Sequence, residues 1–138
     1  MTTNQNHDLQ LYRRIVEQAP DAIIFADRKG VIRLWNAGAE AIFGYMAGEA
    51  VAQNLDLIIP EKLRAAHWRG YELAMTTGRT KLNGKALATR GTHKLGTPLY
   101  VEMAFKVITD EQGGVLGALA TARDITQRYL AERARKSA

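Results

Sequence analysis

The chain contains no cysteine, and this absence removes several kinds of chemistry at once. Without thiols it can form no disulfide, no thiolate metal site and no cysteine nucleophile. Photochemistry that forms a bond between a flavin and a cysteine is excluded for the same reason. The absence of thiols therefore gives no indication of the redox state of the compartment.

Long hydrophobic runs are also missing. The longest apolar stretches cover only a few residues, and the N-terminal sequence, MTTNQNHDLQ, is polar. A membrane span needs about 20 consecutive apolar residues, and a secretory signal needs an apolar segment of about 7–15 residues. We therefore expect neither feature, and we expect a cytoplasmic location.

The motifs of common enzyme classes do not occur. The sequence shows no nucleophile with a partnered base, no glycine-rich phosphate loop and no metal-spaced group of carboxylates. The formal net charge is +5, but Lys and Arg residues are spread along the chain among acidic residues. We therefore expect no enzyme activity, no direct binding of nucleic acid and no membrane partner.

The first half of the chain predicts helices around one hairpin. A length of 138 residues suits one domain with a single core. Apolar residues between positions 9 and 16 recur at helical spacing, which predicts an amphipathic helix after a polar leader. Two short strands follow, DAIIFAD and VIRLWN, and Gly30 between them allows a hairpin turn. Three short helical pieces then lead to residue 60.

The second half of the chain has strand-like patterns. Expected strands cover residues 81–92, 98–108 and 115–123, separated by turn sequences, which predicts an antiparallel meander. In the middle strand, apolar side chains alternate with a mixed set, so one face is apolar. A final helix is predicted after Asp124, its N-cap candidate, with Gln127 at the reciprocal capping position.

One helix carries an unexpected histidine. Residues 58–71 read IIPEKLRAAHWRGY, in which Pro60 can start a helix. Leu63, His67 and Tyr71 follow at steps of four, so the imidazole shares a face with two large apolar side chains. Its neighbours on that surface are small: Ala66, Gly70 and Ala74. A flat group could lie against them, although a half-exposed histidine with local hydrogen bonds is the alternative interpretation.

Two motifs resemble those of PAS domains. The sequence GVIRLWNAGAEAIFGY is similar to the second strand and following helix of that family, with its N-x-x-A-E-x-x-F-G-Y pattern. ARDIT resembles the D-I-T signature between the last strand and a signalling helix. The resemblance covers roughly residues 12–126 and implies the α+β PAS fold: a five-stranded antiparallel sheet, short helices on one face, and N- and C-terminal flanking helices. We expect a leader and cap helix over 1–19, the PAS sensor domain over 20–124 and a signalling helix over 125–138.

Within the family, residues 58–71 are most similar to haem-binding oxygen-sensor PAS domains of the FixL and direct oxygen sensor phosphodiesterase type. His67 matches the histidine that ligates the iron, and its spacing to the hairpin glycine, Gly96, matches without a gap. The resemblance therefore implies a b-type haem with His67 as proximal ligand, whose other ring nitrogen donates to a carbonyl or carboxylate. The residues expected to contact the haem through apolar surface are Ile59, Leu63, Tyr71, Leu82, Phe105, Ala118 and Ala120.

The same resemblance implies an apolar distal side. The arginine that contacts oxygen in those sensors falls at Leu87, and the exchangeable methionine falls at Lys85. Met103 could reach the iron as a sixth ligand, and Lys81 falls where a propionate partner is found. Because no distal donor is retained, bound oxygen is disfavoured more than carbon monoxide or nitric oxide. The implied function is a signal-transduction sensor of a diatomic gas or of iron redox state.

Two other functions stay open at this point. One is a ligand-free PAS module for dimerisation or protein interaction, and the other is a PAS domain that binds a non-covalent flavin or another small molecule. The apolar stripe of the N-terminal helix predicts a homodimer through that helix and the sheet. The C-terminal helix predicts a downstream output domain or partner protein. His7 and His93 are assigned no role, and Trp68 is expected to face away from any haem.

Overall fold

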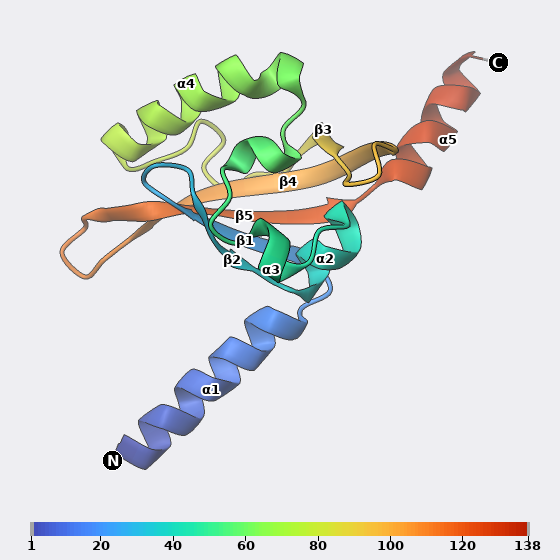
Figure 1. Cartoon of the computed structure of the whole chain (residues 1–138). Coiled ribbons are helices and arrows are strands. Elements are labelled where there is room, and N and C mark those ends of the chain that lie inside the picture. The colour runs from blue at the N-terminus through green and yellow to red at the C-terminus, as the bar shows by residue number, and fades with distance from the viewer. Residues whose placement is uncertain (1, 138) are drawn as a thin grey trace.

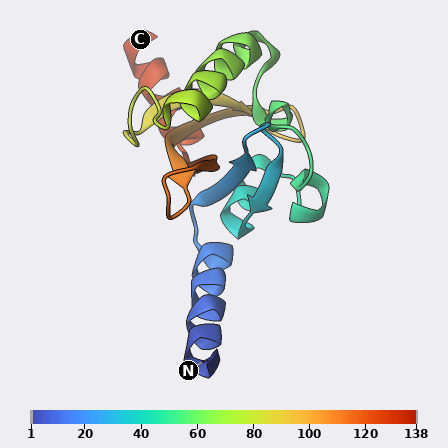
Figure 2. The same cartoon turned by 90° about the vertical axis from the view of Figure 1, so that its left-hand side faces the viewer.

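Five antiparallel strands form the centre of the computed structural model, which describes residues 2–137 (Figure 1). The strand order is β2-β1-β5-β4-β3. Helices α2, α3, η1 and α4 lie on one face, whereas α1 extends away from the sheet in both views (Figures 1 and 2). The elements are α1 (Thr2–Gln18), β1 (Ala22–Asp27), β2 (Ile32–Trp35), α2 (Ala37–Phe43), α3 (Ala47–Ala50), η1 (Leu55–Ile58), α4 (Glu61–Thr77), β3 (Leu87–Thr92), β4 (Pro98–Thr109), β5 (Val115–Asp124) and α5 (Thr126–Ser137). This is the predicted α+β architecture.

The hairpin between β1 and β2 forms as predicted, and its turn requires a glycine for two reasons. Gly30 has a φ of 80°, in the left-handed region that favours glycine. A Cβ atom at this position would lie 2.2 Å from the ring of Trp68, so the turn also depends on close packing against α4. The Asp27 carboxylate holds the turn by accepting from the backbone N–H groups of Lys29 and Val31.

Asn36 joins the end of α1 to the sheet and to α2. Its Oδ1 accepts from the backbone N–H of Ile23 at 2.8 Å and of Ala39 at 3.0 Å. Its Nδ2 donates to the carbonyl of Val16 at 2.8 Å and of Asp21 at 3.0 Å. The side chain is 3% exposed and is the only buried polar one among the residues whose burial is described. Its hydrogen bonds remove the cost of burying an amide.

The inner face of the sheet, which faces the helices, has large side chains on β4 and small ones on β5. Phe105 pairs with Ala120, and Val107 pairs with Ala118. Directly opposite residues in an antiparallel pair lie on the same face, so each larger side chain stands beside an alanine. Except for Phe105, which is half-buried, these residues are buried. Within residues 2–137, no helix combines the length and the apolar character that a membrane crossing requires.

Three predicted boundaries were wrong. The strand expected from residue 81 begins only at Leu87, because Asn83 and Gly84 have positive φ values of 48° and 86° and form a turn. The first helix begins at Thr2 rather than after a polar leader, since no glycine or proline interrupts residues 2–18. The last helix begins at Thr126, so Asp124 lies at the end of β5, where its Oδ1 accepts from the Thr126 N–H.

Candidate functional site around His67

Helix α4 presents His67 along one edge of the domain. The helix begins after Pro60 and ends at Gly78, whose φ of 80° gives the left-handed C-terminal cap that glycine favours. Its buried residues are Tyr71, Ala74 and Met75, which share one face. The adjacent face is uncovered. Helix α4 therefore packs against the rest of the domain through this buried face, and its neighbouring face is exposed to solvent.

The His67 ring is half-buried, and one of its nitrogens has no partner. Its Nδ1 is buried and makes no hydrogen bond with any described residue. The ring lies edge-on to Trp68, with centroids 4.7 Å apart, and 5.7 Å from the ring of Tyr71. Burial lowers the pKa of His67 below its ordinary value of 6.5, and the charge of Asp56 opposes this effect only in part. The imidazole is therefore neutral at pH 7 and has a lone pair available for a ligand.

Tyr71 and Trp68 both contact the β1–β2 hairpin, and Trp68 also contacts η1. The Tyr71 hydroxyl donates to the carbonyls of Asp27 at 2.5 Å and Ala26 at 3.2 Å. Burial, and to a lesser degree the charge of Asp27, raises the pKa of Tyr71 to about 12, so it remains a donor. Trp68 Nε1 donates to Asp56 Oδ1 at 2.8 Å while the ring lies over the hairpin turn. These contacts fix the rotation of α4, and with it the position of His67.

The predicted distal residues lie on the inner face of the sheet, but they are not equally covered. Leu87 of β3 pairs with Met103 of β4, so both point to the same side. Met103 is 7% exposed, whereas Leu87 is 51% exposed. Leu63 on α4 and Leu82 in the connection to β3 are each 40% exposed. The segments from α4 to β3 therefore leave apolar side chains uncovered, although uncovered apolar surface is costly in water.

The remaining predicted residues occupy different environments. Ala118 and Ala120 are buried in β5. Ile59 follows η1 and is half-buried, and Lys81 is exposed in the turn before β3. Phe105 is half-buried on β4. The fold thus brings the predicted residues to α4, to the inner face of the sheet and to the connection between them.

The donor set suits an iron held by a porphyrin better than a bare metal ion. Among residues 2–137 there is no group of three or more acidic, histidine or cysteine side chains that could hold an ion. A porphyrin supplies four ligands itself and needs only one or two from the protein, such as a neutral imidazole. The neutral imidazole of His67 can supply one such ligand, so the type of residue present fits a haem.

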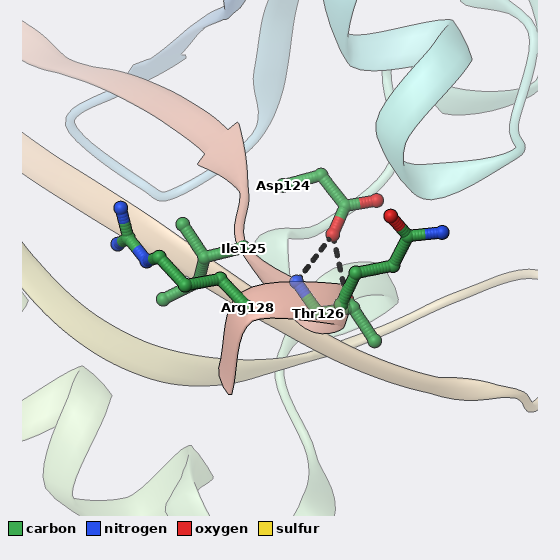
Figure 3. A pocket seen from close by; sticks show the side chains of 5 residues that line it. Asp124, Ile125, Thr126 and Arg128 are labelled. Carbon is green, nitrogen blue, oxygen red and sulfur yellow. Dashed lines mark hydrogen bonds between the residues drawn. The ribbon is translucent and has the colours of Figure 1, made fainter. Parts of the chain in front are cut away.

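Neither of the two described clefts lies at His67. One of about 330 Å³ lies between the β1–β2 turn and α4, and one of about 390 Å³ lies where β5 meets α5 (Figure 3). Neither is lined by His67.

Sequence reasoning missed two roles near this site. Trp68 was assigned no partner, yet it bonds Asp56 and covers Gly30; the glycine of a tight turn was the available signal. His93 was assigned no role, but its ring lies against Gly44, and its Nδ1 accepts from the Leu95 N–H at 3.0 Å. The contacts of Trp68 with Asp56 and Gly30, and of His93 with Gly44, join segments distant in sequence, which a local pattern does not reveal.

The PAS fold family model matches residues 10–125, so the chain belongs to the PAS family. It is a PAS sensory domain of the kind used in signalling. Sensor protein FixL of Bradyrhizobium diazoefficiens is 29% identical over 115 residues, which are 83% of this chain and 22% of that protein. Oxygen sensor protein DosP of Escherichia coli is 25% identical over 109 residues, 79% of this chain and 13% of that protein. The chain therefore spans less than a quarter of these relatives.

A solved structure supports the same assignment. The PAS domain of a protein from Colwellia psychrerythraea is 25% identical and superimposes with a TM-score of 0.75. The match covers 86% of this chain and 98% of that one. The PAS fold predicted from the sequence is thereby confirmed.

Proposed function

We propose that this PAS domain binds b-type haem through His67 and signals either the binding of a diatomic gas or the redox state of the iron. The observation that carries the proposal is the buried, unpartnered Nδ1 of a neutral imidazole. A buried nitrogen without a partner costs about 1–3 kcal/mol, and a ligand that uses its lone pair recovers that cost. The similarity to an oxygen sensor protein supports the proposal.

Each residue has a distinct role in this proposal. His67 would supply one protein ligand to the iron, and Met103 is the candidate for a second. Leu63, Leu82 and Leu87 change from exposed apolar side chains to covered ones, which contributes affinity. Lys81, exposed in its turn, is the candidate partner of a propionate. When bound, the haem supplies an iron that takes up carbon monoxide, nitric oxide or oxygen and can change oxidation state.

The absorption spectrum of the purified protein, before and after addition of haemin, tests the proposal. A Soret band that saturates at one haemin per chain supports it. A folded protein that stays colourless and takes up no haemin contradicts it and favours a ligand-free interaction module. A yellow protein with a band near 450 nm, as expected of an oxidised flavin, contradicts it and favours a flavin-binding domain.

Leu87 is predicted to limit oxygen affinity. Replacing it with arginine places a donor on the inner face opposite Met103, where the native residue offers none. A hydrogen bond to a charged group contributes about 1.5–3 kcal/mol, so oxygen affinity should rise by roughly 10- to 100-fold, while carbon monoxide affinity changes less. Gas titrations of the haem-loaded protein measure both. Leu95→Arg, at an exposed hairpin residue, is the control, and equal effects of the two variants would contradict the role of Leu87.

We propose a homodimer in which α1 buries its apolar stripe against the sheet of a second copy. Four side chains of α1 are more than half exposed: Leu9, Leu11, Tyr12 and Ile15. Ile15→Lys is expected to shift the protein to a monomer, because it places a charge in the buried stripe. Light scattering after size exclusion measures the mass, with Gln10→Lys, on another side of α1, as control. An unchanged dimer in Ile15→Lys would contradict this interface.

The proposed organisation follows these elements. We propose a division into an N-terminal segment over 1–19 that contains α1, a sensor domain over 20–124 and a C-terminal signalling segment over 125–138 that contains α5. We propose that α5 leads to, or docks on, an output domain or partner protein. Its last turn carries Arg135 and Lys136.

A further inference from the structure

The two flanking helices are attached at the same end of the sheet. Ala22 at the start of β1 pairs with Ala122 near the end of β5. Helix α1 therefore enters the sheet beside the point where α5 leaves it, and the two helices run in different directions from that end (Figure 1). We call the region where β1 begins and β5 ends the junction. Contacts within it link the end of α1 to the start of α5.

Helix α1 is held at the junction by Asn36. The Nδ2 of this buried side chain donates to the carbonyl of Val16, in the last turn of α1, and to that of Asp21, just before β1. Its Oδ1 is used by Ile23 and Ala39. The end of α1 is thus tied to the sheet by one donor group.

An ion pair continues the connection to β5. The carboxylate of Asp21, whose carbonyl is bound by Asn36, accepts from Arg123 Nε at 3.1 Å. Arg123 lies one residue before Asp124, the last residue of β5. The same short segment, residues 19–21, therefore contacts both the anchor of α1 and the strand that leads to α5.

Helix α5 is held at its first turn by the end of β5 and by β4. Asp124 Oδ1 accepts from the N–H of Thr126 at 2.9 Å and from its hydroxyl at 2.6 Å (Figure 3). The Thr126 Oγ1 accepts from the Tyr100 N–H at 3.0 Å. The rings of Tyr100 and Tyr129 stack with centroids 4.0 Å apart and an angle of 17° between their planes. Beyond Tyr129 the helix is largely exposed, so this turn sets its direction.

We propose that this junction couples the orientations of α1 and α5, so that the domain relays a displacement of one helix to the other. The path runs from Asn36 through Asp21 and Arg123 to the turn held by the Tyr100–Tyr129 stack. It does not pass through His67, so the coupling does not depend on haem. A change at α1 would then reach whatever follows α5, and reciprocity requires the reverse effect as well.

Spin labels can test the coupling, because the chain has no native cysteine. One label pair, Gln10→Cys with Gln112→Cys, reports α1 against the β4–β5 turn. The other, Glu132→Cys with Gln112→Cys, reports α5. Electron–electron double resonance without haemin gives the distance distributions, and dilution with unlabelled protein removes distances between copies. We expect one narrow distribution for each pair in the parent protein.

Asn36→Asp is the first perturbation. It keeps an acceptor for the Ile23 and Ala39 N–H groups but loses the donor to the α1 carbonyls. We expect the distance distributions of both label pairs to broaden. Adding Arg123→Gln to this variant removes the ion pair with Asp21, so we expect the α5 distribution to become narrow again while the α1 distribution stays broad. Arg33→Gln, which removes an exposed ion pair with Asp27, is the matched control and should restore nothing.

Tyr129→Leu tests the reverse direction and alters only a half-buried residue on α5, so the domain should fold even if the Asn36 variant does not. It should broaden the α1 distribution as well as that of α5. If, in either experiment, the distance distribution broadens only for the helix that was altered, the proposed coupling is wrong. The haemin titration is a separate measurement. A negative result with the spin labels therefore does not bear on the proposed cofactor, and a negative haemin titration does not bear on the coupling.

Discussion

His67→Ala is expected to abolish the Soret band that we propose for the protein with haemin. Alanine removes the only side chain on α4 that can donate a lone pair to the iron from a buried, unpartnered nitrogen. Apolar contacts alone then hold the porphyrin, and its spectrum should resemble that of free haemin. Absorption spectra of equal concentrations of the two proteins during haemin titration measure the effect.

The control is His7→Ala, which makes the same substitution at an exposed position on α1 and should leave the spectrum unchanged. The circular dichroism of His67→Ala should match that of the parent, because the imidazole makes no Nδ1 hydrogen bond that the fold requires. His67→Gly should regain a ligated spectrum when imidazole is added. A full Soret band in His67→Ala would assign the iron to another residue.

Asn36→Ala should be strongly destabilising. The substitution leaves five backbone groups without their side-chain partner: the N–H groups of Ile23 and Ala39 and the carbonyls of Val16, Ala19 and Asp21. Each unsatisfied buried group costs about 1–3 kcal/mol, so the free energy of unfolding should fall by more than about 3 kcal/mol. Urea denaturation followed by circular dichroism measures the change.

Asn54→Ala provides the matched control, since Asn54 is also the N-cap of a helix. Its Oδ1 accepts one hydrogen bond, from the exposed Asp56 N–H. Losing such a cap typically costs about 1 kcal/mol. Equal losses of stability in the two variants would mean that Asn36 acts only as a cap and that its bonds to α1 contribute little.

Local patterns predicted much of the fold correctly. The alternation of apolar residues in β4 and the apolar runs beside Gly30 depend on periods of two residues, which are visible in the sequence itself. The N-x-x-A-E pattern from Asn36 identified the family, although it did not reveal that the asparagine side chain reaches back to α1. The strand expected at residue 81 failed because the backbone turned at Asn83 and Gly84.

The candidate site was predicted only in part. The spacing of Leu63, His67 and Tyr71 placed the imidazole on a partly apolar face, but the Tyr71 hydroxyl is used by the carbonyls of Ala26 and Asp27. That contact joins residues more than forty positions apart, so no window of sequence contains it. The exposure of Leu87 likewise depends on which segments pack over β3, which the local pattern does not show.

The sequence by itself determined the class of fold, the order of its elements and the position of His67 on a helix beside Tyr71, because periodicity and residue type are local properties. Only the tertiary structure decided that the Nδ1 of His67 is buried without a partner, that Leu87 is uncovered, and that the end of α1 is linked to the end of β5 through Asn36, Asp21 and Arg123. Each of these depends on which distant segments pack together, and packing sets both burial and hydrogen-bond partners.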